Sequence, residues 1–106
     1  MNKIGIDIVE VNRIQLTESM IKSILHNDEM KYLEKLESDD AKKQFLAGRW
    51  AVKEAIIKVV DNPLLPKNMN IGYNGKKPIV LNEDLKHIEI SIAHEKNYAV
   101  ATALNL

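Results

Sequence analysis

The chain has 106 residues, with 15 basic and 15 acidic side chains, no cysteine and 45% hydrophobic residues, which is typical of one compact soluble domain. The balanced charge excludes a global nucleic-acid-binding surface, and the absence of cysteine excludes disulfides, a thiol nucleophile and thiolate metal sites. A chain this short buries only about 60–65% of its unfolded surface on folding, so we expect an oligomer that hides further apolar area.

The first predicted element is a strand over residues 3–11. Its apolar side chains recur at every second position, which is the spacing of a half-buried strand. One face carries Ile4, Ile6 and Ile8, and the other carries Gly5, Asp7 and Val9. No apolar run at this end is long enough for a signal peptide or a membrane span, so we expect a cytoplasmic protein without a membrane partner.

Helices are expected between residues 12 and 60. The first covers 12–25 with Asn12 as its N-cap, and a shorter helix restarts at Asn27 and ends before Ser38. Ser38 then begins the longest helix, about 39–60, because it is a favourable cap and the two aspartates after it suit the positive end of the helix dipole. The segment Asp61-Asn62-Pro63 ends this helix.

The last third of the chain is predicted to be β structure. Strands are expected over 69–73 and 79–81 around a turn at Asn74-Gly75, followed by a polar turn or short helix over 82–86. A hairpin follows, with strands over 88–94 and 98–104. No repeat or linker interrupts the chain, so the order of strand, helices and strands indicates a single α+β domain over 1–106 with an antiparallel sheet and a C-terminal hairpin.

Several polar residues stand in unusual surroundings. Asp7 interrupts a run of isoleucines, where aspartate is depleted; it either faces water at a sheet edge or pairs with Glu54 to hold Mg²⁺, which prefers oxygen ligands. Glu54 and Lys58 have the spacing of an ordinary solvated helix pair, although their neighbours are less polar than a typical exposed face. His94 ends a hairpin strand beside a turn, where a side chain can reach a ligand; His26 and His87 are interpreted as surface or capping residues.

Three segments together resemble the holo-acyl-carrier-protein synthase family of 4′-phosphopantetheinyl transferases. They are Gly5-Ile6-Asp7 with Arg13, then Gly48-Arg49-Trp50-Ala51-Val52-Lys53-Glu54-Ala55 with Lys58, then Ser91-Ile92-Ala93-His94. Their order and relative spacing also match, and the resemblance extends from residue 4 to residue 103. It implies the phosphopantetheinyl transferase fold. It also implies transfer of 4′-phosphopantetheine from coenzyme A to a serine of apo-acyl carrier protein, with release of adenosine 3′,5′-bisphosphate, as a step of fatty acid biosynthesis.

The resemblance also implies roles for individual residues. Asp7 and Glu54 would hold Mg²⁺, with Mn²⁺ as an alternative, and Glu54 or a metal-bound water would take the serine proton. Lys58 would donate to the phosphate oxygens, and Arg13 would meet the acidic carrier protein. The coenzyme A site would be formed by Arg49, Lys58, Gly75, Lys77, Pro78 and His94. The turn at 75–78 is one residue longer than in relatives, so either Lys76 or Lys77 faces the nucleotide.

Family members are usually trimers with coenzyme A bound between subunits, which agrees with the small core expected here. Trp50 stands where relatives have Phe, and Ala93 where they have Ser or Thr.

The main alternative is a non-catalytic carrier-protein or nucleotide-binding module of the same fold, which would not need Asp7, Glu54 and Lys58 together. A small nucleic-acid-binding domain is a further alternative. This chain lacks the basic excess and the aromatic platforms that such a domain needs.

Overall fold

The computed structural model describes residues 2–106. The elements follow in this order: strand β1 (Lys3–Glu10), 3-10 turn η1 (Val11–Arg13), helix α1 (Glu18–Ile24), 3-10 turn η2 (Asn27–Glu29), helices α2 (Met30–Glu34) and α3 (Asp39–Ile57), 3-10 turn η3 (Pro66–Asn68), and strands β2 (Ile71–Asn74), β3 (Lys77–Val80), β4 (Glu89–His94) and β5 (Tyr98–Asn105). The predicted α+β order of strand, helices and strands is confirmed. None of the helices within 2–106 is long and apolar enough to cross a membrane.

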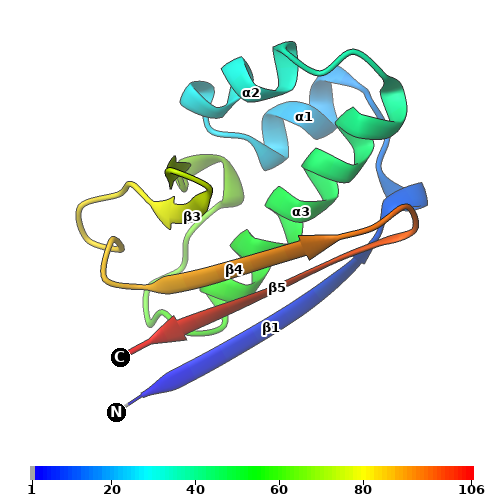
Figure 1. Ribbon diagram of the computed structural model, residues 1–106. Helices are drawn as coiled ribbons and strands as arrows, with labels where there is room; N and C mark the ends of the chain where they lie inside the picture. The colour runs from blue at the N-terminus through cyan, green and yellow to red at the C-terminus, as the bar shows by residue number, and fades with distance from the viewer. Residues whose placement is uncertain (1) are drawn as a thin grey trace.

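An antiparallel sheet of three strands and a long helix make the frame of the molecule. The strand order is β1-β5-β4, so β1 is an edge strand, and α3 lies across one face of the sheet (Figure 1). The hairpin β2–β3 forms a separate small sheet beside β4, and α1 and α2 lie at the far end of α3. The two ends of the chain lie next to each other, because β1 and β5 pair along their full length.

Small side chains let α3 approach the sheet closely. A Cβ added at Gly5 would lie 2.4 Å from the backbone oxygen of Ala55, which shows that β1 and α3 touch through their backbones. Alanines line both sides of the contact between α3 and the sheet, and each is almost completely buried: Ala47, Ala51, Ala55, Ala99, Ala101 and Ala103. Larger side chains at these positions would push the helix off the sheet and open the core.

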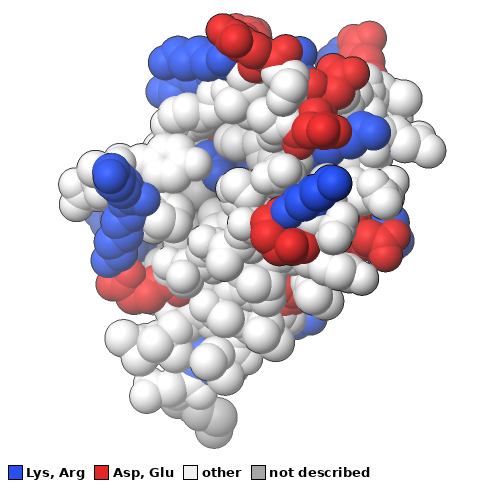
Figure 2. Space-filling view, turned by 45° about the vertical axis from the view of Figure 1, so that its right-hand side comes forward, with Lys and Arg blue, Asp and Glu red and all other residues white. Residues whose placement is uncertain are grey.

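The structure decides which face of β1 points inward. The alternation of side chains predicts two faces but does not tell which of them is buried. Gly5 and Val9 are buried against α3, whereas Ile4, Ile6 and Ile8 are 75%, 59% and 63% exposed. The isoleucines therefore form an apolar outer face on the sheet. Figure 2 shows broad uncharged surface in the lower part of the molecule, while charged side chains gather toward the upper end, where Figure 1 places α1 and α2.

Local sequence patterns predict some helix boundaries correctly and others wrongly. The predicted start of α3 is confirmed, since Ser38 Oγ accepts a hydrogen bond from Ala41 N at 3.0 Å, but the helix ends at Ile57 rather than residue 60. The expected helix over 12–25 is wrong in its first half. Ile14 is extended and buried in the core, and α1 begins only after Thr17, whose hydroxyl accepts from Met20 N at 3.2 Å. The burial of Ile14 overrides the local helical spacing.

The β structure follows the expected order with shifted ends. The C-terminal hairpin is confirmed as β4 and β5, whereas β3 begins at Lys77, two residues before the predicted strand. Gly75 has a φ of 64°, so the turn between β2 and β3 uses the left-handed conformation that glycine adopts without strain.

Candidate active site

Asp7 and Lys58 meet where β1 crosses the end of α3. Lys58 Nζ lies 3.6 Å from Asp7 Oδ1 and donates a hydrogen bond to the backbone oxygen of Ile6 at 2.6 Å. The Asp7 side chain is 24% exposed, so this aspartate does not simply face water at a sheet edge. Glu54 is one helical turn before Lys58 and shares its face of α3. We call Asp7, Glu54 and Lys58 the carboxylate–lysine cluster.

The donors of this cluster fit a magnesium ion. Within residues 2–106, no hydrogen bond or ion pair joins the Glu54 side chain to another residue, and the contact between Asp7 and Lys58 is a long one. Among the described residues, there is no group of three or more histidine, cysteine or acidic side chains that could hold a metal ion. Mg²⁺ is usually bound through one or two carboxylates, with water and substrate phosphates completing its shell, so two acids beside a lysine are chemically suited to it.

A second group of predicted residues lies in a small cavity between α3, β4 and the β2–β3 hairpin. This arginine cavity has a volume of about 180 Å³ and is lined by Phe45, Gly48, Arg49, Tyr73, Lys76, Pro78, Ile92 and His94. Lys76 lines it, whereas Lys77 forms an ion pair with Glu89 at 3.1 Å, and Gly75 lies in the turn just outside. The structure therefore brings Arg49, Pro78 and His94 together and favours Lys76 over Lys77 as the lysine of this cavity.

Arg49 is held in place by buried partners. Its guanidinium donates from Nε to Glu29 Oε2 at 2.6 Å and from Nη1 to the Tyr73 hydroxyl at 3.1 Å. The side chain is only 3% exposed, and its positive charge lies over the rings of Phe45 and Tyr73. Glu29 was not expected as a functional residue. The only sequence signal for it is an acid three positions after His26, which is the spacing of a helix capping box.

Lys53 shares the same buried carboxylate. Its ammonium donates to Glu29 Oε1 and to the backbone oxygen of Ile24, the latter at 2.8 Å, and the residue has no exposed surface. Burial lowers the pKa of Lys53 to about 8, although the negative charge of Glu29 acts in the opposite direction. The like-charged pair Arg49 and Lys53 on one helix face is thus explained by a carboxylate from another segment lying between them.

The two groups lie at different places along α3. No member of the carboxylate–lysine cluster lines the arginine cavity. Lys58 follows Arg49 by nine positions, which corresponds to about 13 Å along a helix axis. Gly48 faces Ile92 of β4, while Lys58 faces Gly5 of β1. One chain therefore presents two partial sites, one where α3 meets β1 and the other where α3 meets β4.

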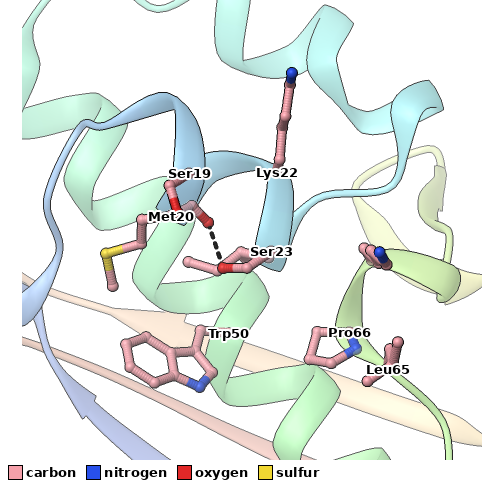
Figure 3. Close-up of a pocket in the computed structure, with 9 residues that line it drawn as sticks. Ser19, Met20, Lys22, Ser23, Trp50, Leu65 and Pro66 are labelled. Carbon is pink, nitrogen blue, oxygen red and sulfur yellow. Dashed lines mark hydrogen bonds between the residues drawn. The ribbon is translucent and has the colours of Figure 1, made fainter.

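A larger apolar cavity of about 580 Å³ lies between α1, α3 and η3 (Figure 3). We call it the tryptophan cavity, lined by Ser19, Met20, Lys22, Ser23, Ile24, Trp50, Leu65, Pro66 and Lys67. In Figure 3 Met20 extends from α1 above the indole of Trp50, which comes from α3. The exposed Arg13 lies beside this cavity, with its guanidinium carbon 5.6 Å from the centre of the Trp50 ring.

Known proteins match this chain over nearly its whole length. The family model of the 4′-phosphopantetheinyl transferase superfamily matches residues 3–103. A holo-[acyl-carrier-protein] synthase of Mycoplasma capricolum subsp. capricolum is 47% identical over 98% of this chain and 94% of its own length, and one of Petrotoga mobilis is 35% identical over 95% and 92%. A crystal structure of the synthase from Bacillus anthracis in complex with CoA (3′,5′-ADP) superimposes with a TM-score of 0.84, covering 95% of this chain and 92% of the other at 31% identity.

Proposed function

Because this chain belongs to the 4′-phosphopantetheinyl transferase superfamily, we infer that it transfers the 4′-phosphopantetheine arm of coenzyme A to a serine of apo-acyl carrier protein. The products are holo-acyl carrier protein and adenosine 3′,5′-bisphosphate. The observation that carries this inference is the meeting of Asp7 and Lys58 between β1 and α3, with Glu54 one helical turn away. Two acids and a lysine on one surface suit phosphoryl transfer better than simple ligand binding.

The reaction needs charge neutralisation and an aligned hydroxyl more than covalent chemistry by the protein. Asp7 and Glu54 would hold Mg²⁺, or Mn²⁺ as an alternative, which when bound neutralises charge on the pyrophosphate. Lys58 already lies beside Asp7 and would donate to the phosphate oxygens as the pyrophosphate bond breaks. Glu54, directly or through one water, would accept the proton of the attacking serine.

The arginine cavity suits the nucleotide end of coenzyme A. Arg49, Lys76 and His94 bring two basic side chains and one imidazole to a cavity whose other walls are aromatic and aliphatic. An anionic group bound to a planar base requires both kinds of surface. Phosphates of the nucleotide would therefore face the cations, and the base would lie against the apolar wall.

The two partial sites support a homotrimer with coenzyme A between subunits. The cavity of one subunit would face the carboxylate–lysine cluster of its neighbour, because one chain presents the two groups at separate places along α3. The exposed isoleucines Ile4, Ile6 and Ile8 offer the apolar surface that such an assembly would cover. A ring closed by the same heterologous contact three times would complete every site.

The carrier protein would dock on the α1 side, beside Arg13. This exposed arginine adjoins the tryptophan cavity, and Lys22 and Lys67 line the same cavity. A cationic rim around an apolar pocket would steer an acidic partner and mainly raise its rate of association. Such an arrangement fits an acidic carrier better than it fits coenzyme A alone.

Mass spectrometry tests the transfer directly. Apo-acyl carrier protein incubated with this chain, coenzyme A and Mg²⁺ should gain the mass of one phosphopantetheine arm, and a carrier whose acceptor serine is replaced by alanine should gain nothing. The non-catalytic alternative predicts binding of coenzyme A or carrier with no mass change. An unmodified carrier under conditions in which a related synthase modifies it would contradict the proposal.

Subunit complementation tests the shared site. An Asp7→Ala chain should be inactive alone, and an Arg49→Met chain should transfer little at coenzyme A concentrations far below its raised KM. Refolded together, about a quarter of the contacts in randomly mixed rings should pair an intact cluster with an intact cavity, and activity should partly return. A mixture that stays as inactive as its components would place the whole site within one subunit.

A further inference from the structure

Glu29 is a fully buried carboxylate that the proposed reaction does not use. It accepts hydrogen bonds from Arg49 Nε at 2.6 Å, from Lys53 Nζ, and from the backbone N–H of His26 at 2.8 Å. These donors come from α3 and from the segment between α1 and α2, so Glu29 joins the helix to that segment. Both oxygens of this carboxylate therefore accept hydrogen bonds from donors inside the protein.

The contacts of Arg49 show what this arrangement leaves free. A guanidinium has five N–H donors. Within residues 2–106, Arg49 uses one on Glu29, one on the Tyr73 hydroxyl at 3.1 Å and one on the backbone oxygen of Ile71 at 3.5 Å. Two donors remain, one on each terminal nitrogen, and Arg49 is one of the residues that line the arginine cavity.

The surroundings of Arg49 would not hold it there without a negative charge. Its guanidinium carbon lies 4.6 Å from the ring centre of Phe45, 5.2 Å from that of Tyr73 and 5.6 Å from that of Tyr32. These rings stabilise a cation weakly compared with the cost of removing it from water. Lys53 adds a second buried cation close by. Without Glu29, the long side chain of Arg49 would turn toward solvent and leave the cavity.

We propose that Glu29 is a positioning residue for nucleotide binding: it fixes Arg49 so that the two free guanidinium donors meet a phosphate group of coenzyme A in the arginine cavity. This inference rests on the proposed function, since it takes the ligand of the cavity to be a phosphorylated adenosine. Glu29 touches neither substrate nor metal. Its loss should therefore weaken nucleotide binding while the chemical step at the carboxylate–lysine cluster continues.

The test compares Glu29→Gln, Lys53→Met and the double variant Glu29→Gln/Lys53→Met. The double variant removes one negative and one positive charge, so the net charge of the buried group is unchanged, and Lys53→Met alone accounts for the lost hydrogen bond to the Ile24 backbone oxygen. With Glu29 replaced, KM for coenzyme A should rise at least tenfold while kcat stays within threefold of wild type. Calorimetry with adenosine 3′,5′-bisphosphate should show the same tenfold loss. Lys53→Met should leave KM within twofold, because Glu29 still pairs with Arg49.

Each outcome decides a separate question. A folded double variant with the KM of wild type would overturn the positioning role, and so would a Lys53→Met variant that raises KM as much as the double variant does. An inactive wild type that nevertheless binds adenosine 3′,5′-bisphosphate with Glu29-dependent affinity would contradict the transfer reaction and leave the positioning role standing.

A measurement on the unmodified protein covers the case in which neither Glu29 variant folds. The Nε–H resonance of Arg49, assigned through its absence in Arg49→Lys, should be slow to exchange with water and should persist when adenosine 3′,5′-bisphosphate is added. The Nη resonances should shift on the same addition. Fast exchange of the Nε–H, or no change at Nη, would show that Arg49 is not anchored for the phosphate and would overturn the inference.

Discussion

Lys58 is the residue at which a structural and a chemical role predict different results. A lysine that only forms a surface pair on a helix contributes about 0.2–0.5 kcal/mol. Here the ammonium instead donates to the Ile6 backbone oxygen and faces Asp7. If it meets the developing phosphate charge, Lys58→Met should lower kcat by about 10²–10³, the effect of losing one preorganised donor.

Steady-state transfer and thermal melts on the same Lys58 samples separate the two roles. The melting temperature should change little, and Lys58→Arg should rescue activity only partly, because a planar guanidinium does not replace a compact ammonium. Lys86→Met, which removes an exposed lysine paired with Glu83, is the matched control and should leave the rate unchanged. A Lys58→Met enzyme within threefold of wild type would return Lys58 to the surface-pair role.

The two acids of the cluster should respond together to metal. Asp7→Ala and Glu54→Ala should each abolish most transfer and weaken its dependence on Mg²⁺, because each removes one of only two protein carboxylates offered to the ion. Titration of Mg²⁺ in the transfer assay measures both effects. Asp61→Ala, which removes an exposed carboxylate paired with Lys3, should behave as wild type. Normal turnover of either variant at limiting Mg²⁺ would refute the metal assignment.

The buried Lys53 should make stability depend on pH in the alkaline range. Its folded pKa of about 8 lies below the ordinary value of 10.5, so between these values the unfolded chain binds a proton that the folded chain does not. The free energy of unfolding should therefore rise with pH across this window. The full rise corresponds to about 3 kcal/mol at most.

Urea unfolding of wild type and Lys53→Met at one protein concentration measures this contribution. The difference between the two free energies of unfolding isolates Lys53 from the other lysines and the tyrosines, which titrate in both proteins. The wild type should gain stability relative to the variant as the pH rises from 8 to 10.5. A constant difference would mean that Lys53 keeps its ordinary pKa despite burial.

At the scale of elements, the position of the cluster depends on how closely β1 approaches α3. In Gly5→Ala the new Cβ would lie 2.4 Å from the Ala55 backbone oxygen, so β1 must move away from the helix. Overpacking of this kind typically costs about 1–3 kcal/mol. Asp7 would move with the strand and lose its alignment with Lys58, so transfer should fall as well as the melting temperature.

Gly48→Ala is the matched control for Gly5→Ala. Its Cβ would meet only the Ile92 Cγ2 methyl at 3.2 Å, a side-chain atom that can shift by a few tenths of an ångström. Alanine also favours the helix over glycine by about 1 kcal/mol, which offsets the contact. Melting curves should therefore leave Gly48→Ala close to wild type. Equal melting temperatures for Gly5→Ala and wild type would show that the backbone contact is not limiting.

At the scale of the whole molecule, the proposed trimer depends on the outer face of the sheet. Ile6 is 59% exposed in the single chain, so Ile6→Lys should cost the subunit little stability while placing a charge in the proposed trimer contact. Sedimentation should show a trimer for wild type and a folded monomer for Ile6→Lys. The monomer should be inactive, because its two partial sites no longer meet those of a neighbour.

Leu81→Lys is the control for this assembly experiment. Leu81 is 47% exposed but lies after β3, outside the three-stranded sheet, so the variant should remain trimeric and active. A wild-type monomer that is active at nanomolar concentration would refute the trimer. An Ile6→Lys trimer with normal activity would move the contact to another surface.

The sequence by itself determined what depends on neighbouring residues. Ser38 with the two aspartates after it predicted the start of α3, and the alternating residues of the last stretch predicted the hairpin of β4 and β5. The prediction that Asp7, Glu54 and Lys58 carry the chemistry also came from sequence motifs, and the structure brings Asp7 and Lys58 together. Caps, turns and periodicity act over a few residues, so they can be read without knowing the fold.

Only the tertiary structure decided what depends on distant segments. It placed the isoleucines of β1 outside, because the close approach of Gly5 to α3 commits the other face to the core. It buried Glu29 between Arg49 and Lys53, partners that are 20 and 24 residues away in the chain. Such contacts are set by the packing of whole elements, since the free energy of burying a charge depends on every segment that closes around it.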